Sequence, residues 1–467
     1  MLADPDFIPF EPPVGSNPGA LKRNTVETFP RALYETPCKK RYRRTLADAL
    51  VLTDPELIHE LLVVQPENFI RDDLARRLLA PLLGENSILM AEGPEWRWQR
   101  RAAAPAFRHD SLLALVPTMV DAARRQVERW RKLPVDQTVD VAEEMTNVTF
   151  EIITETLFGR ANALDFGAFS ETLYEYSSSL RTRAMLSFMR LPAWTPFPGR
   201  WRAARGRDRM VQLIRTPVKD RSILGGSSPS GLFDLLFNAE DAETGRRMTE
   251  EELVKNLATF LNAGHETTAV ALTWSLWLLS KDQESQERVA AEARQVLGDD
   301  PVEARHIDQL TFTRQVIQEA MRLYPPAPAL ARRPRMAMSF GGEAITRRTQ
   351  VTVAIYPLHR NQGLWDQPDA FDPERFTPDK VKARPRHAYM PFGAGPRICI
   401  GATFSLIEAV AVLAELARAY RFAPLAGYRP QILGHVTMRP HEGMPLYVTP
   451  REAGRRRAPR APAEAVA

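Results

Sequence analysis

The chain has 467 residues, with 62 lysines and arginines and 57 aspartates and glutamates, so its formal charge is +5. This charge is too dilute over such a length to indicate a nucleic-acid partner. Apolar residues make up 44% and charged residues 25% of the sequence, which excludes a wholly disordered chain, a collagen-like fibre and a coiled coil. Two cysteines, Cys38 and Cys399, are too few for a disulfide framework or a four-cysteine zinc site.

Residues 1–44 are predicted to form an extended N-terminal arm, because prolines cluster between Pro5 and Pro18. The opening sequence MLADPD brings acids early and lacks the basic and apolar regions of a secretory signal. The longest mainly apolar stretch, Ala269 to Leu279, is about half of the roughly 20 residues that cross a bilayer. We therefore predict a cytoplasmic protein with no integral membrane segment.

Helical periodicity dominates the rest of the chain. Helices are predicted over residues 112–130, 141–158, 169–188, 249–280 and 400–420. Strand-like runs are few and lie mainly late, as in residues 350–356, and no strand–helix alternation indicates a Rossmann sheet. The expected fold is mostly α with a small β part.

The chain is expected to divide into three regions, of which the N-terminal arm is the first. One large domain is expected over residues 45–450, with a flexible surface loop at 225–231 inside it. Arginines and prolines follow at 451–467, where a disordered basic tail is expected.

A basic segment near residue 100 carries Trp96 and Arg100 four positions apart. On a helix this spacing places both side chains on one face. Taken alone, the segment is typical of a solvated basic helix with interfacial tryptophans.

The predicted helix 249–280 is the longest element, and Thr249 with Glu252 forms a capping box at its start. Its middle holds polar residues at positions where a buried helix is apolar. They are Asn262, His265, Glu266, Thr267 and Thr268. Because buried polar groups are costly unless they are paired, this face is either hydrated or used for chemistry.

Glu319 and Arg322 lie three residues apart before Pro325 and Pro326, which end the predicted helix. On most helices such a pair is a surface ion pair of small energy.

The segment 391–401, PFGAGPRICIG, carries the strongest signal. Its glycines permit turns and close approach to a flat ligand. Cys399 directly precedes a predicted helix, whose N-terminal end would lower the pKa of the thiol. The alternative is a buried structural cysteine beside a glycine turn.

The spacing Phe392-x-x-Gly395-x-Arg397-x-Cys399-x-Gly401 resembles the haem-ligand loop of the cytochrome P450 family. Five fixed residue types in ten positions arise by chance in about one chain in 10⁴. The resemblance implies that Cys399 is the thiolate ligand of haem b, iron protoporphyrin IX, and that the chain adopts the P450 fold as a single large domain.

Other segments extend the similarity over residues 45–450. By resemblance, Ala263 and Gly264 let haem and O2 approach the long helix, while Glu266 and Thr267 relay protons. Glu319, Arg322 and Arg375 resemble the family's buried structural triad. The residues that resemble cofactor-binding positions are Trp96, Arg100, Phe392, Gly395, Arg397, Gly401 and either Arg332 or its neighbour Arg333.

The resemblance implies a haem-thiolate monooxygenase that inserts one atom of O2 into a hydrophobic small molecule, such as a fatty acid or a terpenoid. Electrons from NAD(P)H would arrive through a separate ferredoxin or flavodoxin-like donor and its reductase, since no such module is apparent in the sequence. Basic residues are predicted to dock an acidic donor. They are Arg97, Arg101, Lys380, Lys382, Arg384 and Arg386.

Two other classes remain open. A haem-thiolate enzyme that uses peroxide, or that acts without O2, would share the same ligand loop, although the intact pair Glu266 and Thr267 argues against it. A non-catalytic haem-binding protein would also need only one thiolate ligand.

Overall fold

The computed structural model describes residues 24–43, 48–134, 137–160, 164–180, 182–183, 186, 191, 194–223, 231–434 and 436–451. The longer helices are α4 (Asp73–Leu83), α5 (Gly93–Ala103), α7 (Val116–Arg131), α8 (Val141–Phe158), α9 (Phe166–Ser177), α11 (Arg200–Ile223), α13 (Glu250–Lys281), α14 (Gln283–Leu297), α15 (Thr311–Leu323) and α18 (Ala402–Ala419). Short helices are α2 (Ala32–Glu35), α3 (Pro55–His59), α6 (His109–Leu113), α12 (Leu232–Phe237), α16 (Ile355–Leu358) and α17 (Pro378–Ala383). The strands are β1 (Lys39–Arg43), β2 (Asp48–Leu52), β3 (Phe69–Arg71), β4 (Thr138–Asp140), β5 (Leu330–Pro334), β6 (Met338–Phe340), β7 (Glu343–Ile345), β8 (Thr349–Val353), β9 (Tyr420–Pro424), β10 (Ile432–Gly434), β11 (Met438–Pro440) and β12 (Pro445–Pro450).

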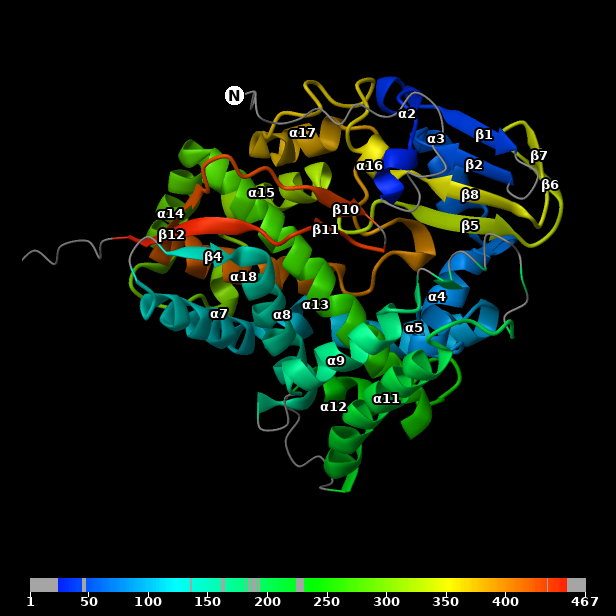
Figure 1. Ribbon diagram of the computed structural model, residues 1–467, viewed down its shortest axis with the longest axis horizontal. Coiled ribbons are helices and arrows are strands. Elements are labelled where there is room, and N and C mark those ends of the chain that lie inside the picture. Colours follow the sequence, from blue (N-terminus) through cyan, green and yellow to red (C-terminus); the bar gives the residue numbers. More distant parts are fainter. Residues whose placement is uncertain are drawn as a thin grey trace, which may run out of the picture.

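A five-stranded sheet with the order β1-β2-β8-β5-β3 lies at the opposite end of the molecule from α11 and α12 (Figure 1). Strands β2 and β8 are parallel, and the other neighbours are antiparallel. Leu50, Leu52, Val351 and Val353 are fully buried in this sheet. Smaller sheets pair β4, β12 and β9, then β10 with β11, and β6 with β7.

The predicted extended arm over residues 1–44 differs from the structure in its later part. Val26, Phe29 and Leu33 are buried, and β1 pairs with β2 in the register Lys39↔Leu52. The boundary expected at residue 45 therefore falls between two paired strands. The burial of Val26, Phe29 and Leu33 shows that this segment packs against the core, which the cluster of prolines before it does not indicate.

The strands do lie mainly late, since eight of the twelve strands in the described residues, β5 to β12, follow residue 329. The sequence did not indicate that the five-stranded sheet also takes β1, β2 and β3 from the first 71 residues. Strand β1 reads KKRYR, which is a charged edge strand rather than an alternating one. Strand β3 has three residues and is too short to show a period.

The long helical predictions agree with the structure. Helix α8 has the predicted bounds, and α13 begins with Thr249 as its N-cap in a complete capping box with Glu252. The predicted helix 112–130 is instead divided into α6 and α7, with Pro117 in the first turn of α7. Helix α9 ends at Ser177, and much of the stretch between there and residue 188, where a helix was predicted, lies outside the described residues. Most of the predicted loop 225–231 and the predicted tail beyond Arg451 also lie outside them.

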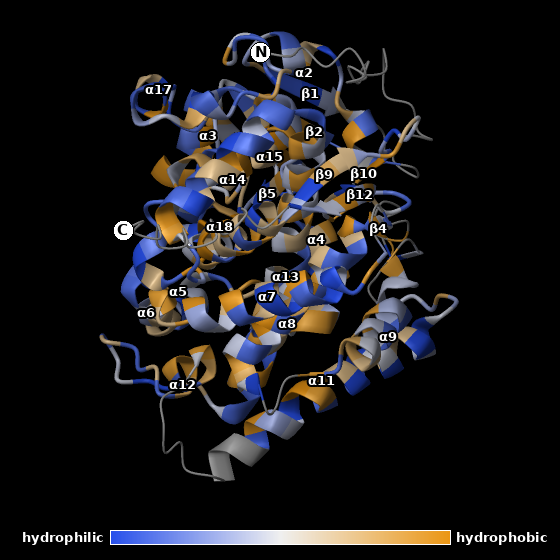
Figure 2. Ribbon diagram, turned by 90° about the vertical axis from the view of Figure 1, so that its left-hand side faces the viewer, coloured by the Kyte–Doolittle hydropathy of each residue, from blue (hydrophilic) through white to orange (hydrophobic). Residues whose placement is uncertain are grey.

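Helix α13 runs through the middle of the molecule (Figure 1). Its 32 residues extend about 48 Å at 1.5 Å per residue. It contacts α8, α11, α15 and α18, and both tryptophans of its C-terminal half, Trp274 and Trp277, are buried. Figure 2 shows α9 and α11 at the end of the molecule away from β1 and β2. None of the described helices is both long and apolar enough to cross a bilayer.

The predicted triad is present as a buried ion cluster. The Arg322 guanidinium donates to both carboxyl oxygens of Glu319, at 2.6 and 2.7 Å, and both side chains are fully buried. Arg375 Nε lies 3.4 Å from Glu319 Oε1. Arg322 also donates to the carbonyl oxygens of His359, Pro368 and Ala370, so Glu319 and Arg322 join α15 to the segment before the cysteine loop.

We predict that Glu319→Gln or Arg322→Leu destabilises the protein by about 3–5 kcal/mol and gives little haem-loaded protein, because each change leaves a buried charge unpaired. The free energy of unfolding and the haem content of purified protein test this. The exposed pair Arg31–Glu35 is the control, and Arg31→Ala should cost less than about 1 kcal/mol. Wild-type stability in both triad variants would contradict a structural role for the cluster.

Candidate haem-binding site

The cysteine loop is held by backbone contacts. Residues Gly395–Arg397 form the 3-10 helix η8, and the Cys399 N–H donates to Phe392 O at 3.0 Å. Gly395 has φ +72°, and a Cβ there would lie 1.9 Å from Leu62 O. Only glycine fits at residue 395, because the loop lies directly against the backbone of η2 (Glu60–Val64).

The structure corrects the prediction that the Cys399 thiol has a lowered pKa. The side chain is accessible to solvent, yet the protein around it desolvates the thiol and raises its pKa above the ordinary value. The N–H of Gly401 and the charge of Arg100 oppose this shift. Helix α18 begins only at Ala402, so the thiol lies before the helix rather than on its first turn.

Helix α13 passes the site with a short stretch of small residues. Ala263 is exposed, although Leu261 and Thr268 on the same helix are buried. Gly264 was predicted to open the helix toward the cofactor, but a Cβ there would meet Ile153 Cδ1 at 3.2 Å. Gly264 therefore lets α13 pack against α8, and Ala263 is the small residue that faces open space.

The polar residues of this stretch are all paired. The Thr267 hydroxyl donates to Ala263 O at 2.7 Å, and Glu266 Oε1 accepts from the Thr437 hydroxyl at 2.6 Å. The Thr268 and Ser405 hydroxyls lie 3.0 Å apart and connect α13 to α18. His265 Nδ1 lies 2.8 Å from Leu261 O, and burial lowers the pKa of this histidine, so it is a packed neutral side chain.

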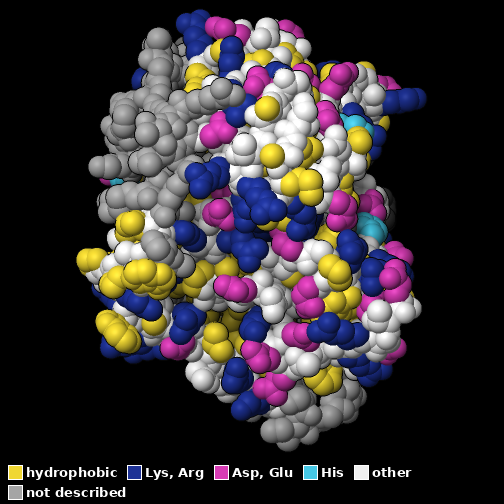
Figure 3. Space-filling view, turned by 90° about the vertical axis from the view of Figure 1, so that its right-hand side faces the viewer, with side chains coloured by type: hydrophobic (Ala, Val, Ile, Leu, Met, Phe, Trp, Pro, Cys, Tyr) yellow, Lys and Arg dark blue, Asp and Glu magenta, His cyan; other side chains and the backbone are white. Residues whose placement is uncertain are grey.

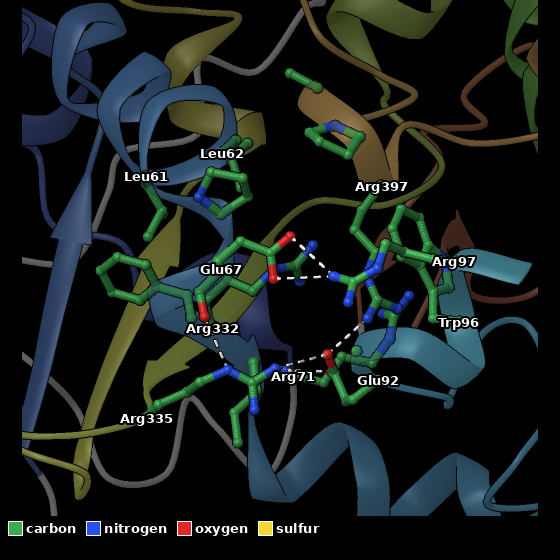
Figure 4. Close-up of a pocket in the computed structure, with 16 residues that line it drawn as sticks. Leu61, Leu62, Glu67, Arg71, Glu92, Trp96, Arg97, Arg332, Arg335 and Arg397 are labelled. Atoms are coloured by element: carbon green, nitrogen blue, oxygen red, sulfur yellow. Dashed lines mark hydrogen bonds and ion pairs between the residues drawn. The ribbon is translucent and has the colours of Figure 1, made fainter.

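A pocket beside the cysteine loop gathers arginines from distant parts of the chain (Figure 4). Its basic side chains are Arg71, Arg97, Arg332, Arg335 and Arg397, and its acidic side chains are Glu67 and Glu92. The Arg397 guanidinium lies over the Trp96 ring at 4.2 Å and donates to Glu92 Oε2 at 2.6 Å. Lysine and arginine side chains also gather near the middle of the face shown in Figure 3.

Arg332 and Arg333, the two alternatives for one cofactor-binding position, are neighbours on β5 and point to different surroundings. Arg332 is buried and lines the pocket. In the antiparallel pair of β5 and β3 it lies opposite Arg71. Arg333 points elsewhere and forms an ion pair with Asp73 at 3.0 Å. Arg332 is therefore the residue that can contact a pocket ligand.

The pocket has more positive than negative charge, and part of this charge is desolvated. Burial, together with the neighbouring Arg332 and Arg397, lowers the pKa of Arg71 to about 9. Burial also lowers the pKa of Arg397 to about 10. Arg71 Nε is buried without a hydrogen-bond acceptor among the described residues. Such a pocket is built to receive an anion with two or more carboxylate oxygens.

Arg71, Arg335 and Glu92 were not predicted from the sequence, because their shared pocket depends on strand pairing and loop packing that no local pattern reveals. The predicted residue Arg100 is partly buried, and its charge interacts with Cys399. An accessible thiol, a desolvated arginine pocket and an exposed alanine on a buried helix together fit a haem, whose iron takes a thiolate and whose propionates take arginines.

The comparisons agree with this geometry. The family model Cytochrome P450 matches residues 42–444. The chain belongs to the cytochrome P450 family. It is 34% identical to a cytokinin hydroxylase of Arabidopsis thaliana over 86% of this chain and 78% of the relative. It is 31% identical to cyclooctat-9-en-7-ol 5-monooxygenase of Streptomyces melanosporofaciens over 81% of each chain, and 27% identical to cytochrome P450 4A10 of Mus musculus over 80% and 76%.

The predicted fold and activity class are thus confirmed. The protein is an oxidoreductase of the monooxygenase type with the mostly α P450 fold, and P450 enzymes of this type use a haem-thiolate, O2 and electrons from NAD(P)H delivered by partners.

This P450 also buries an acid on α18. Glu408 is fully buried, and neither of its carboxyl oxygens has a hydrogen-bond partner among the described residues. Burial raises its pKa well above the ordinary value, and the nearby Thr268 hydroxyl opposes the shift only in part. The carboxyl group therefore keeps its proton to a higher pH than an exposed glutamate does.

We predict that Glu408→Gln gains stability relative to the wild type as pH rises. Because the pKa of Glu408 is raised in the folded protein, its contribution to the free energy of unfolding is fully present below the ordinary pKa of a glutamate. As pH rises from there toward the pKa of the folded state, the free energy of unfolding of the wild type falls by about 1.4 kcal/mol per pH unit. The amide stays neutral throughout. Urea unfolding at pH 5, 6 and 7 measures the difference, with Glu85→Gln at an exposed site as the control. A pH-independent difference would show that Glu408 titrates normally.

Proposed function

We propose that Cys399 ligates the iron of haem b and that the enzyme inserts one oxygen atom into an apolar small molecule. The observation that carries this proposal is the accessible Cys399 thiol in a glycine-constrained loop beside a desolvated arginine pocket. When bound, the haem-thiolate supplies the activation of O2. The peptide groups of the loop position the thiol.

The pocket residues would hold the two propionates. Of the residues expected from the sequence, Trp96, Arg332 and Arg397 line the pocket, whereas Arg100 lies closer to the Cys399 thiol, with which its charge interacts. Arg71 joins the pocket residues because its buried guanidinium has an unpaired N–H. Bidentate arginine–carboxylate pairs would remove the excess positive charge from this pocket. Phe392 and Gly401 support the ligand loop through the Cys399 backbone and thiol.

Glu266 and Thr267 would carry protons to the oxygen site. The Thr267 hydroxyl donates to the carbonyl oxygen of the exposed Ala263, one helical turn earlier, and would be placed beside a flat cofactor that packed against this alanine. Glu266 is the neighbouring acid and lies where the β10–β11 hairpin meets α13. Positioned proton transfer of this kind is worth roughly 10²–10⁴-fold in rate.

The substrate class we propose is a terpenoid or a fatty acid. The relatives include enzymes named for the oxidation of cyclooctat-9-en-7-ol and for cytokinin, and Glu266 rather than aspartate in the α13 segment resembles members that act on long apolar chains and isoprenoids. The cytoplasmic location expected from the sequence remains a prediction.

We predict that the reduced, CO-bound protein shows the red-shifted Soret band of a thiolate-ligated haem and that Cys399→Ala abolishes it. The reason is that Cys399 is the thiol accessible at this site, whereas Cys38 is half-buried and donates to Ala32 O at 3.5 Å. Difference spectra of both variants provide the measurement, with Cys38→Ala as the matched control. A normal band in haem-loaded Cys399→Ala would overturn the ligand assignment.

The electron donor is proposed to be an acidic ferredoxin or flavodoxin-like protein. The basic surface expected for it is smaller than the sequence indicated. Arg384 packs against the Trp365 and Phe376 rings at 4.5 and 4.6 Å, and Arg101 is paired with Asp241 at 2.7 Å. Lys382 and Arg386 remain exposed in the segment that leads to the cysteine loop.

We predict that Lys382→Glu with Arg386→Glu slows reduction by an acidic ferredoxin severalfold at low salt, because the basic residues raise the encounter rate. The effect should shrink once ionic strength brings the Debye length well below about 10 Å. Stopped-flow reduction rates over a salt series test this, with Arg131→Glu on α7 as a control that changes the charge of another exposed residue. A salt-independent rate would place docking elsewhere.

A further inference from the structure

The hairpin β10–β11 brings a hydroxyl to the acid of α13. Thr437 lies 171 residues from Glu266 along the chain, and its hydroxyl donates to Glu266 Oε1 at 2.6 Å. This is the one hydrogen bond that the Glu266 side chain makes with a described residue. The adjacent Val436, at the tip of the same turn, is half exposed.

Both strands of this hairpin are anchored. On β10, the Asn24 side chain donates to Ile432 O at 2.6 Å and accepts from the Gly434 N–H at 3.0 Å. On β11, the Met438 N–H donates to Pro326 O at 2.9 Å, and Met438 O accepts from the Trp274 indole of α13 at 3.0 Å. The position of Thr437 relative to α13 is therefore fixed by contacts on each side of the turn.

We propose that Thr437 is a positioning residue that holds the Glu266 carboxylate in the orientation required for proton transfer. The Thr437 hydroxyl donates to Glu266 Oε1, which leaves Glu266 Oε2 available to exchange protons with water. The inference rests on the proposed role of Glu266 and Thr267 and adds a residue outside α13 to it.

The physical reason is the freedom of a glutamate side chain. An unrestrained carboxylate samples several rotamers, and a displacement of about 1 Å from the productive geometry can cost roughly 10²-fold in rate. A hydroxyl donating to a carboxylate makes a short, charge-assisted bond that selects one rotamer. The anchored turn supplies this donor without a local rearrangement.

The test compares Thr437→Val, which keeps the shape but removes the donor, with Thr437→Ser, which keeps the hydroxyl. The holoenzyme is driven by NADPH with a surrogate ferredoxin and its reductase, in the presence of dodecanoic acid as the apolar probe. The measured quantity is peroxide released per NADPH oxidised. Glu266→Gln and Thr267→Ala are the reference variants, and Arg439→Ala, on the exposed side of β11, is the matched control.

We expect Thr437→Val to release more peroxide per NADPH oxidised, so that the fraction of NADPH oxidised without peroxide release falls about tenfold. Thr437→Ser should restore the wild-type fraction. Peroxide-driven oxidation of guaiacol should change less than twofold, because peroxide brings its own protons. The CO spectrum and the melting temperature should match the wild type. A crystal structure of haem-loaded Thr437→Val should show the Glu266 side chain displaced or in several rotamers.

Two results would overturn the proposal. In the first, Glu266→Gln raises peroxide release but Thr437→Val does not, or Glu266 keeps its orientation in the Thr437→Val crystal structure. Thr437 then does not position the acid, and the proposed role of Glu266 as a proton carrier is unaffected. If Glu266→Gln itself behaves like the wild type, the proposed proton relay fails and the role of Thr437 fails with it.

Discussion

The central constraint on this fold is that α13 must be buried over most of its length while it carries polar side chains at its middle. An unpaired polar group in such a position costs free energy comparable to a lost hydrogen bond. The helix meets this requirement in two ways. His265 and Thr267 use carbonyl oxygens of their own helix, whereas Thr268 reaches Ser405 on α18 and Glu266 reaches Thr437 on the hairpin.

A second constraint is electrostatic and lies on the other side of the site. Residues from β3, α5, β5 and the cysteine loop place arginines together in one pocket, where burial and mutual repulsion lower the pKa of Arg71 and Arg397. A protein gains no stability from such an arrangement unless an anion is present, since each buried charge pays for its desolvation. Burial also raises the pKa of the nearby Cys399 thiol, so a cation would be needed to favour the thiolate there. A ligand that combines a metal ion with two carboxylates resolves both.

Most of the long helices, the cysteine loop and the triad could be predicted from the sequence, because each has a local signature. Helical periodicity defined α8 and α13, and a capping box gave the start of α13. The spacing around Cys399 indicated the loop that we propose to hold the haem iron. The strands β1 and β3 could not be predicted, since one is charged and the other has three residues. Arg71 and Thr437 were missed for the same reason: each reaches the site through a pairing of segments distant in the sequence, and neither stands in a pattern that indicates its partner.

Gly264 shows why a motif residue and its role must be separated. Its place beside Ala263 suggests one shared purpose, but the two residues lie on different sides of α13. The missing Cβ of Gly264 faces Ile153 and sets how closely α13 approaches α8, where the Thr149 hydroxyl also donates to His265 O at 2.9 Å. That contact holds one face of the helix against a buried neighbour and leaves Ala263 exposed on another face. Because α8 fixes the rotation of α13 about its own axis, it also determines that Glu266 meets the hairpin and that Thr268 meets α18. The packing of one glycine therefore sets the direction in which each polar side chain of the segment points.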